Sequence, residues 1–444
     1  MKSNRLRALS AAGIALGLLI VGAFGPFRAG SSSGDEPTSS QQAEDYLGPA
    51  VSVADLDVAI GALQASLRNE PDDAGALATL GLAYIQKARV SADPSYYPKA
   101  EKVLTRSLEL EEATNFEAML GMGALDLARH DFAGALDWGR RAKRINPDNA
   151  SIRGVIGDAY LELGLYDEAD RAFQRMVNLR PDLSSYARAS YARELRGDVR
   201  GAIRFMKLAE GAAGTSSDAA WAGYQLGELY FSSGRHAAAS FAYRQGSYLD
   251  PSSVLPRLGI AKIAAARGDF QRATTILERV TRRQPLAEYV ILLGDLYRAS
   301  GRVDEAAGQY ELVAAVEKLY RSNGVNVDLE QALFDADHGN ADRALEVAKT
   351  EYERRPSVHV ADALAWAHYA SGDYTEARRY SKEALRLGTR SALFQFHAGM
   401  IAVELGHTRV ARRHLTTALD INPSFSFVHA AKAAETLEEL ESSR

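Results

Sequence analysis

Cysteine is absent from this chain of 444 residues. Its absence excludes a disulfide framework, a metal site built on thiolates, a cysteine nucleophile and a membrane anchor attached through an acylated cysteine. An excess of charge of one sign is also absent, because 52 basic residues stand against 57 acidic ones and the formal net charge is −5. Charge therefore gives no reason to expect a nucleic acid as partner.

Sequence motifs of common enzyme classes are missing as well. The chain contains no GxxxxGK[ST] phosphate-binding loop and no HExxH zinc motif. Gly121 and Gly123 resemble part of a dinucleotide-binding loop, but they fall inside a predicted helix hairpin instead of following a strand. We therefore expect no enzymatic activity and no cofactor. A divergent enzyme whose repeats supply catalytic carboxylates stays a third alternative.

A single long uncharged run lies near the N-terminus. Residues 8–27 carry no charge, and at about 1.5 Å per residue they can just cross a hydrocarbon layer of about 30 Å. Basic residues precede the run, which predicts a cytoplasmic N-terminus and an exported remainder. We expect residues 1–30 to be a transmembrane signal anchor or a signal peptide, whose cleavage would give a secreted protein. Residues 31–50 are polar and predict a flexible linker.

The remainder of the chain is periodic. Eight of the predicted units carry a turn glycine five residues before an alanine, and six carry a proline twelve residues after that alanine position. Pro147 and Pro181 lie 34 residues apart, as do Pro251 and Pro285. A fixed period of this length predicts a repeat protein.

Each period is typical of a helix hairpin. Ile156, Tyr160 and Leu163 recur at helical spacing and predict a first helix. Gly164 ends that helix, because glycine enters the left-handed conformation at little cost, and Pro181 ends the second helix. One hairpin cannot bury both of its faces, so each hairpin must stack on its neighbours.

The recurring small, aromatic, turn-glycine, alanine and proline positions resemble the tetratricopeptide (TPR) repeat. The unit with Gly157, Tyr160, Ala169, Phe173 and Pro181 follows the family pattern closely. The resemblance covers roughly four fifths of the chain. It implies an all-α fold, an α-solenoid wound as a right-handed superhelix of about ten TPR helix hairpins, with capping helices at its N-terminal and C-terminal ends.

Breaks in the repeat pattern predict how the array is divided. The pattern is interrupted near 212–217 and again near 321–326. At the second break the seventh unit runs on, so its second helix should be long. An insertion at 91–98 in the first unit should protrude as a loop. The predicted blocks are residues 51–216 with the N-terminal capping helix, 217–322, and 323–444 with the C-terminal capping helix.

In the resembled family, the first helices line a concave face that usually binds an extended peptide or a partner helix. By register, this face would present aromatic and charged side chains, which could hold a peptide through packing and charge-assisted hydrogen bonds. Its aromatic residues could instead simply pack between hairpins. The candidate partner-binding groove consists of Trp221, Tyr224, Glu228, Phe231, Lys262, Asp295, Arg298, Trp366 and Tyr369.

One short segment carries groups that metal ions favour. Asp335, Asp337 and His338 lie within four residues, and a chain without cysteine offers only oxygen-rich metal sites. Two residues apart on a predicted helix, the two aspartates point in different directions. We therefore expect them to cap and solvate a helix end, and we expect no metal site.

Together these features favour a scaffold for protein–protein interaction, tethered outside the cytoplasmic membrane. Such a protein would help to assemble or localise an envelope, secretion or transport complex. Its partner would be a protein or peptide in the concave groove, with the membrane contacted through the N-terminal segment. The alternative is an accessory protein that binds a small molecule, a glycan or a metal.

Overall fold

The computed structural model describes residues 53–442, and over that range the chain forms only helices and their connections. The 22 helices of this range are labelled α3 to α24. The prediction of an all-α repeat fold is confirmed. The predicted anchor and linker lie outside the described residues, and none of the described helices has the length and apolar character needed to cross a membrane.

Pairs of consecutive helices form hairpins, because each first helix packs most extensively on the helix that follows it. First helices are buried on nearly all sides, as in α12, where 12 of 17 residues are buried. Second helices bury one face, as in α13, where 5 of 14 residues are buried. The first helices are α4 (Ala74–Ser91), α6 (Phe116–Ala128), α8 (Ala150–Glu162), α10 (Leu183–Leu195), α12 (Ser216–Ser232), α14 (Leu255–Ala266), α16 (Ala287–Ala299), α18 (Asp328–His338), α20 (Val358–Ala370) and α22 (Ala392–Glu404).

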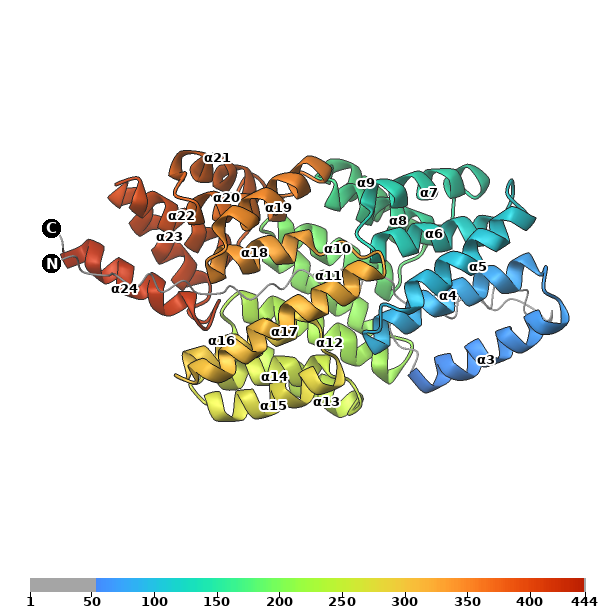
Figure 1. Ribbon diagram of the computed structural model, residues 1–444, viewed down its shortest axis with the longest axis horizontal. Helices are drawn as coiled ribbons and strands as arrows, with labels where there is room; N and C mark the ends of the chain where they lie inside the picture. The colour runs from blue at the N-terminus through green and yellow to red at the C-terminus, as the bar shows by residue number, and fades with distance from the viewer. Residues whose placement is uncertain (1–52, 443–444) are drawn as a thin grey trace.

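The second helices and two flanking helices complete the array. Helix α3 (Val53–Asn69) precedes the first hairpin and α24 (His429–Ser442) follows the last, and the two lie at opposite ends of the molecule (Figure 1). Helix α17 has 20 residues, as the sequence led us to expect. The second helices are α5 (Tyr96–Leu110), α7 (Phe132–Ile145), α9 (Tyr166–Leu179), α11 (Val199–Gly211), α13 (His236–Leu249), α15 (Phe270–Arg283), α17 (Val303–Ser322), α19 (Ala341–Arg354), α21 (Tyr374–Ala384) and α23 (Thr408–Ile421).

Glycines on first helices let the second helices approach. The ring of Phe173 occupies the space that a Cβ atom of Gly157 would need, and Tyr243 does the same at Gly227. Close packing of this kind stabilises each hairpin through many small dispersion contacts. The glycine and aromatic positions of the repeat therefore act together, because the glycine leaves the space that the aromatic ring fills.

The insertion at 91–98 does not protrude. Helix α5 begins at Tyr96, inside the insertion, and Tyr97 is buried in the apolar core of the first hairpins. The prediction of a protruding loop is wrong, because Tyr97 offers a large apolar ring whose burial stabilises the fold. The division of the array into three blocks stays a prediction.

The array winds as a superhelix whose successive turns touch each other. The Nδ1 atom of His130 lies 2.6 Å from the carbonyl oxygen of Asn326, 196 residues away. The backbone N–H of Val358 donates to the hydroxyl of Tyr166 at 2.7 Å, across 192 residues. The side-chain amide of Gln284 donates to the backbone carbonyl of Val90 at 2.8 Å, across 194 residues. At 34 residues a unit, these separations correspond to just under six units, so the described chain makes about two turns.

We call the contact between the two turns the inter-turn seam. The short loops between paired helices in the first superhelical turn contact the connections between hairpins in the second. Gly164 lies in one of these loops, and a Cβ atom there would be 2.6 Å from the carbonyl oxygen of Pro356. Gly197 meets the carbonyl of Gly388 in the same way. The seam comprises residues 90, 129–131, 162–166, 195–197 and 234–236 of the first turn and residues 284, 326, 351–358, 388–389 and 421–422 of the second.

Candidate ligand-binding cavity

The first helices line a cavity of about 330 Å³ between the two turns of the superhelix. Helices α10, α12, α14 and α16 form one part of its wall, and α18, α20 and α22 form the other. Connections 389–391 and 422–427 also line it. The volume lies at the lower end of the range of small-ligand pockets, about 300 to 1,000 Å³.

Carboxyl groups dominate the polar part of the cavity lining. Six of them line it against two fixed cations, and most of the remaining wall is aliphatic or aromatic. Arg390 and Asp420 are exposed, whereas the other groups are buried or partly buried. The carboxyl groups are Glu194, Glu228, Glu288, Asp295, Asp362 and Asp420, and the cations are Lys262 and Arg390, with the imidazole of His359 beside them.

Lys262 is already neutralised by the wall itself. Its Nζ atom lies 2.5 Å from a carboxylate oxygen of Glu228 and 4.6 Å from the centre of the Phe231 ring. The hydroxyl of Tyr243 donates to the second oxygen of Glu228 at 2.5 Å. With these two side chains satisfied, the inner wall keeps an excess of carboxyl groups and no spare ammonium group.

The remaining inner carboxyl groups are poorly solvated. The pKa of Glu288 is raised to about 8, chiefly by burial and also by the neighbouring Glu330 and Glu228, while Lys262 acts in the opposite direction. Burial likewise raises the pKa of Glu194 to about 7. These groups would ionise more readily beside a positive charge, because an adjacent cation favours the carboxylate form.

Two buried polar atoms of the wall have no hydrogen-bond partner. Asp362 is 2% exposed; one oxygen lies 2.9 Å from Nδ1 of His397, and the other has no partner. Tyr224 is fully buried, and its hydroxyl has no partner either. Leaving a buried polar group unpaired costs about 1–3 kcal/mol, so a ligand that supplies a hydrogen-bond partner to either atom would gain affinity.

Five residues of the predicted groove lie in the cavity wall, namely Tyr224, Glu228, Phe231, Lys262 and Asp295.

The other four predicted groove residues do not line the cavity. Trp221 is buried between hairpins, at 7% exposure. The indole N–H of Trp366 donates to Asp337 at 2.7 Å, and the Tyr369 ring stacks on Trp366 with centroids 4.4 Å apart. Arg298 lies outside the lining. The binding of a partner by any of the nine residues stays a prediction.

Several wall residues were missed by reasoning from the sequence. Glu288 is an ionisable residue on a first helix that is otherwise largely buried, and that combination was the available signal. His359 and Phe394 come from the second superhelical turn. Nothing in a repeat pattern shows which units lie opposite each other across an interior, so these two carried no signal.

The prediction that the aspartates of the acidic segment cap and solvate a helix end is wrong, because Asp335 and Asp337 are 3% and 1% exposed and have protein partners. Asp335 forms an ion pair with Arg343, Asp337 accepts the indole N–H of Trp366, and His338 contacts a backbone carbonyl of its own helix at 2.7 Å. Across residues 53–442, no group of three or more histidine, aspartate and glutamate side chains is arranged to hold a metal ion.

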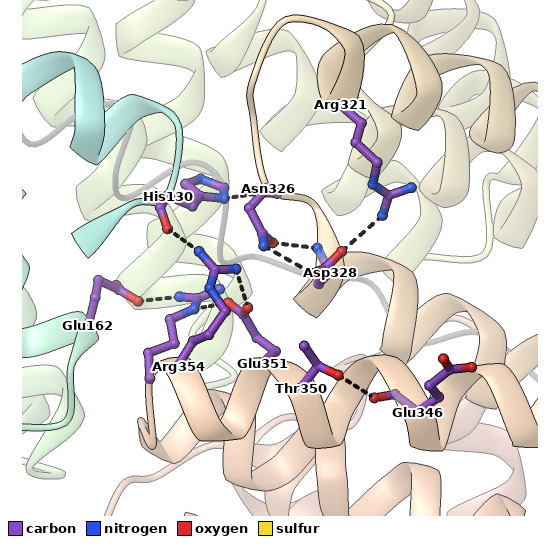
Figure 2. Close-up of polar contacts among 10 residues, drawn as sticks. His130, Glu162, Arg321, Asn326, Asp328, Glu346, Thr350, Glu351 and Arg354 are labelled. Carbon is purple, nitrogen blue, oxygen red and sulfur yellow. Dashed lines mark hydrogen bonds and ion pairs between the residues drawn. The ribbon is translucent and has the colours of Figure 1, made fainter. Parts of the chain in front are cut away.

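A buried cluster of ion pairs links the two superhelical turns whose residues line the cavity. Arg355, which follows α19, donates to a carboxylate oxygen of Glu162 on α8 at 2.6 Å and also contacts Glu351. All three side chains are less than 5% exposed. Figure 2 shows the cluster, with Arg354 reaching from α19 to the backbone carbonyl of His130 at 3.4 Å. The cluster therefore holds the inter-turn seam closed beside the cavity.

Two family models, both described as tetratricopeptide repeat, match the chain. One matches residues 258–323 and 363–424, and the other matches residues 150–183 and 224–253. The matched segments coincide with hairpins α8–α9, α12–α13, α14 to α17 and α20 to α23.

Several solved structures are similar to the chain. The MamA protein is 21% identical over 38% of this chain and 92% of that one, with a TM-score of 0.30. A chain of the APC/C hetero-tetramer Cut9–Hcn1 is 14% identical over 91% of this chain and 83% of that one, with a TM-score of 0.42. Human IFIT1, solved as a dimer with PPP-AAAA, is 15% identical over 76% and 79%, with a TM-score of 0.49. With every one of these TM-scores below 0.5, none bears on what this chain binds.

Proposed function

Since this chain belongs to the tetratricopeptide repeat family, whose repeats serve as protein-interaction scaffolds, we propose that it holds an extended segment of a partner protein on the inner wall of its superhelix. The scaffold acts by shape and side-chain complementarity and performs no catalysis. The partner is a protein or a peptide, and nucleic acid is not among its ligands.

The cavity between the two turns is the observation that carries this proposal. Its wall combines apolar side chains such as Leu229 and Leu292 with carboxyl groups that can accept hydrogen bonds from a peptide. Specific binding sites have this composition, because apolar area supplies affinity and a few placed polar groups fix orientation. Both superhelical turns contribute, so an occupant would be held from two sides.

We also propose that residues 1–30 tether the scaffold to the cytoplasmic membrane and that residues 31–50 serve as the linker. Support comes from the basic residues that precede an uncharged run long enough to span a bilayer. In that position the scaffold would help to assemble or localise an envelope, secretion or transport complex. An alkaline phosphatase fused after Arg444 should be active, whereas a dark fusion and a bright cytoplasmic reporter would reverse the orientation.

Site-specific photo-crosslinking tests the scaffold function. A photoreactive residue at Leu292, on the inner wall, should capture a partner in intact cells. The same residue at Leu312, which is 43% exposed and does not line the cavity, is the matched control. Capture from Leu292 alone supports the proposal; equal capture from both positions, or capture from neither, contradicts it.

A second candidate is an accessory protein that binds a small molecule or glycan. The observation in its favour is the volume of about 330 Å³, which suits a small ligand as well as a short peptide segment. A rise in melting temperature with a panel of sugars or other small metabolites, without capture from Leu292, would favour this candidate over the scaffold.

A further inference from the structure

We propose that the cavity between the two superhelical turns binds an organic cation, the ammonium or guanidinium group of a lysine or arginine side chain in the partner's extended segment. The inference rests on the proposed function and adds the chemistry of the partner. Three independent features of the wall support it: its charge, its unpartnered acceptor atoms and its aromatic faces.

The charge of the wall selects a cation. Glu228 forms an ion pair with Lys262 at 2.5 Å, which leaves Glu194, Glu288, Asp295 and Asp362 as inner carboxyl groups without an ion pair to a lysine or arginine of the inner wall. Burial raises the pKa of Glu288 and of Glu194, and a cation placed beside these carboxyl groups would favour their ionised forms and pair with them. A carboxylate-bearing ligand would find no unpaired lysine or arginine on the inner wall, so the wall discriminates against acidic peptides.

The unpartnered atoms of the wall are suited to a hydrogen-bond donor. One oxygen of Asp362, on α20, and the hydroxyl oxygen of Tyr224, on α12, are buried without partners and belong to residues that line the cavity. Lysine and arginine side chains carry several donors and no acceptor, so their heads can supply what these oxygens lack. The two residues come from different superhelical turns, which places acceptors on both sides of an inserted side chain.

Aromatic rings complete the site. A cation over an aromatic face gains about 0.5–2 kcal/mol, and a long alkyl stem packs well on apolar walls. The wall already holds one cation in this way, since Nζ of Lys262 lies 4.6 Å from the centre of the Phe231 ring. The rings in the lining are those of Tyr191, Tyr224, Phe231, Tyr289, Phe394, Phe425 and Phe427.

Calorimetric titration of the full-length protein tests the inference. The probes are the acetylated, amidated pentapeptide Ala-Leu-Lys-Leu-Ala and two analogues in which norleucine or glutamate replaces the lysine. The lysine peptide should bind at least about tenfold tighter than the norleucine peptide, because charge-assisted hydrogen bonds are worth more than apolar contact alone at a desolvated site. The glutamate peptide should bind most weakly. Equal binding of the lysine and norleucine peptides would overturn the inference.

Two isosteric variants locate the cation. Glu288→Gln and Asp362→Asn should each weaken the lysine peptide about tenfold and leave the norleucine peptide unchanged. Glu311→Gln makes the same substitution at an exposed position outside the cavity and should change neither affinity. Because Asp362 also contacts His397, thermal melting of each variant checks folding, and Glu288→Gln remains informative if Asp362→Asn does not fold. Loss of both peptides to the same extent in the folded Glu288→Gln variant would contradict the assignment.

A free diamine tests whether the occupant is a peptide side chain or a small amine. Cadaverine carries the same ammonium group without a peptide, so binding as tight as that of the lysine peptide would identify a free amine as occupant and overturn the peptide assignment. Weaker binding of cadaverine supports it. The two proposals can fail separately. Capture from Leu292 without a preference for the lysine peptide would contradict the cation inference alone. Failure of that capture would contradict the scaffold function.

Discussion

Gly164→Ala should destabilise the inter-turn seam specifically. Gly164 has a φ of +76° at the turn between α8 and α9, and a Cβ atom there would lie 2.6 Å from the carbonyl oxygen of Pro356. Gly372, at the turn between α20 and α21, has a φ of +82° with nothing within 4 Å of its Cβ position. The second glycine therefore shares the backbone conformation and lacks the contact, which makes Gly372→Ala the matched control.

The two substitutions differ by one physical contribution. Alanine in the left-handed conformation costs about 1–2 kcal/mol, and the smaller freedom of alanine in the unfolded chain offsets about 0.4–1 kcal/mol of this. Gly372→Ala should therefore lower the free energy of unfolding by about 1 kcal/mol. Gly164→Ala must also displace the backbone of the second superhelical turn by a few tenths of an ångström, and overpacking of this kind adds about 1–3 kcal/mol.

Hydrogen exchange with mass spectrometry and urea unfolding are the assays. The amide of Val358 donates to Tyr166 across the seam, so its exchange should speed up in Gly164→Ala about tenfold for each 1.4 kcal/mol lost locally. In Gly372→Ala that amide should exchange at the rate of the unmodified protein. Equal losses of stability in both variants, with unchanged exchange at Val358, would refute the reasoning.

Three further predictions concern buried charge. The pKa of Glu288, about 8 in the folded chain against an ordinary value of 4.5, means that the folded state binds more protons between these pH values. Stability should therefore fall as pH rises from 5 to 8, and urea titrations of Glu288→Gln should show a shallower fall. The groups that face Glu288 from neighbouring helices are Glu228, Glu330 and Lys262. Arg355→Met should cost about 3–5 kcal/mol in urea unfolding because it leaves Glu162 buried without its cation; a loss below 1 kcal/mol would contradict the seam. Trp366→Phe should lower the free energy of unfolding by about 1–3 kcal/mol, because the buried carboxylate of Asp337 loses the indole N–H that donates to it. An unchanged melting temperature would argue against that hydrogen bond.

Local features of the fold could be predicted from the sequence because each depends on neighbours within one repeat. The turn at Gly164, the termination at Pro181 and the packing of Phe173 on Gly157 all follow from residue type and spacing. The pairing of Lys262 with Glu228 was also within reach, since the two lie 34 residues apart and hence at one register position of adjacent hairpins.

The winding of the superhelix could not be predicted. Small rotations between hairpins accumulate over nearly six units before one turn meets the next, so no local pattern specifies which residues touch. The second role of Gly164, as the place where Pro356 comes close, depends on that winding. The cavity depends on the winding too, because residues of both turns form its wall.

A crosslink across the inter-turn seam tests the central claim most directly. In a chain without cysteine, His236→Cys with Asn422→Cys introduces two thiols at side chains that lie 3.0 Å apart across 186 residues. A positive control within one hairpin is Gln395→Cys with His414→Cys, whose native side chains lie 2.6 Å apart. A short bismaleimide should bridge both pairs within single chains. In an open array of stacked hairpins, spaced about 8–10 Å apart, the first pair would be on the order of 50 Å apart. Bridging of the control pair alone would contradict a superhelix whose turns close around a cavity.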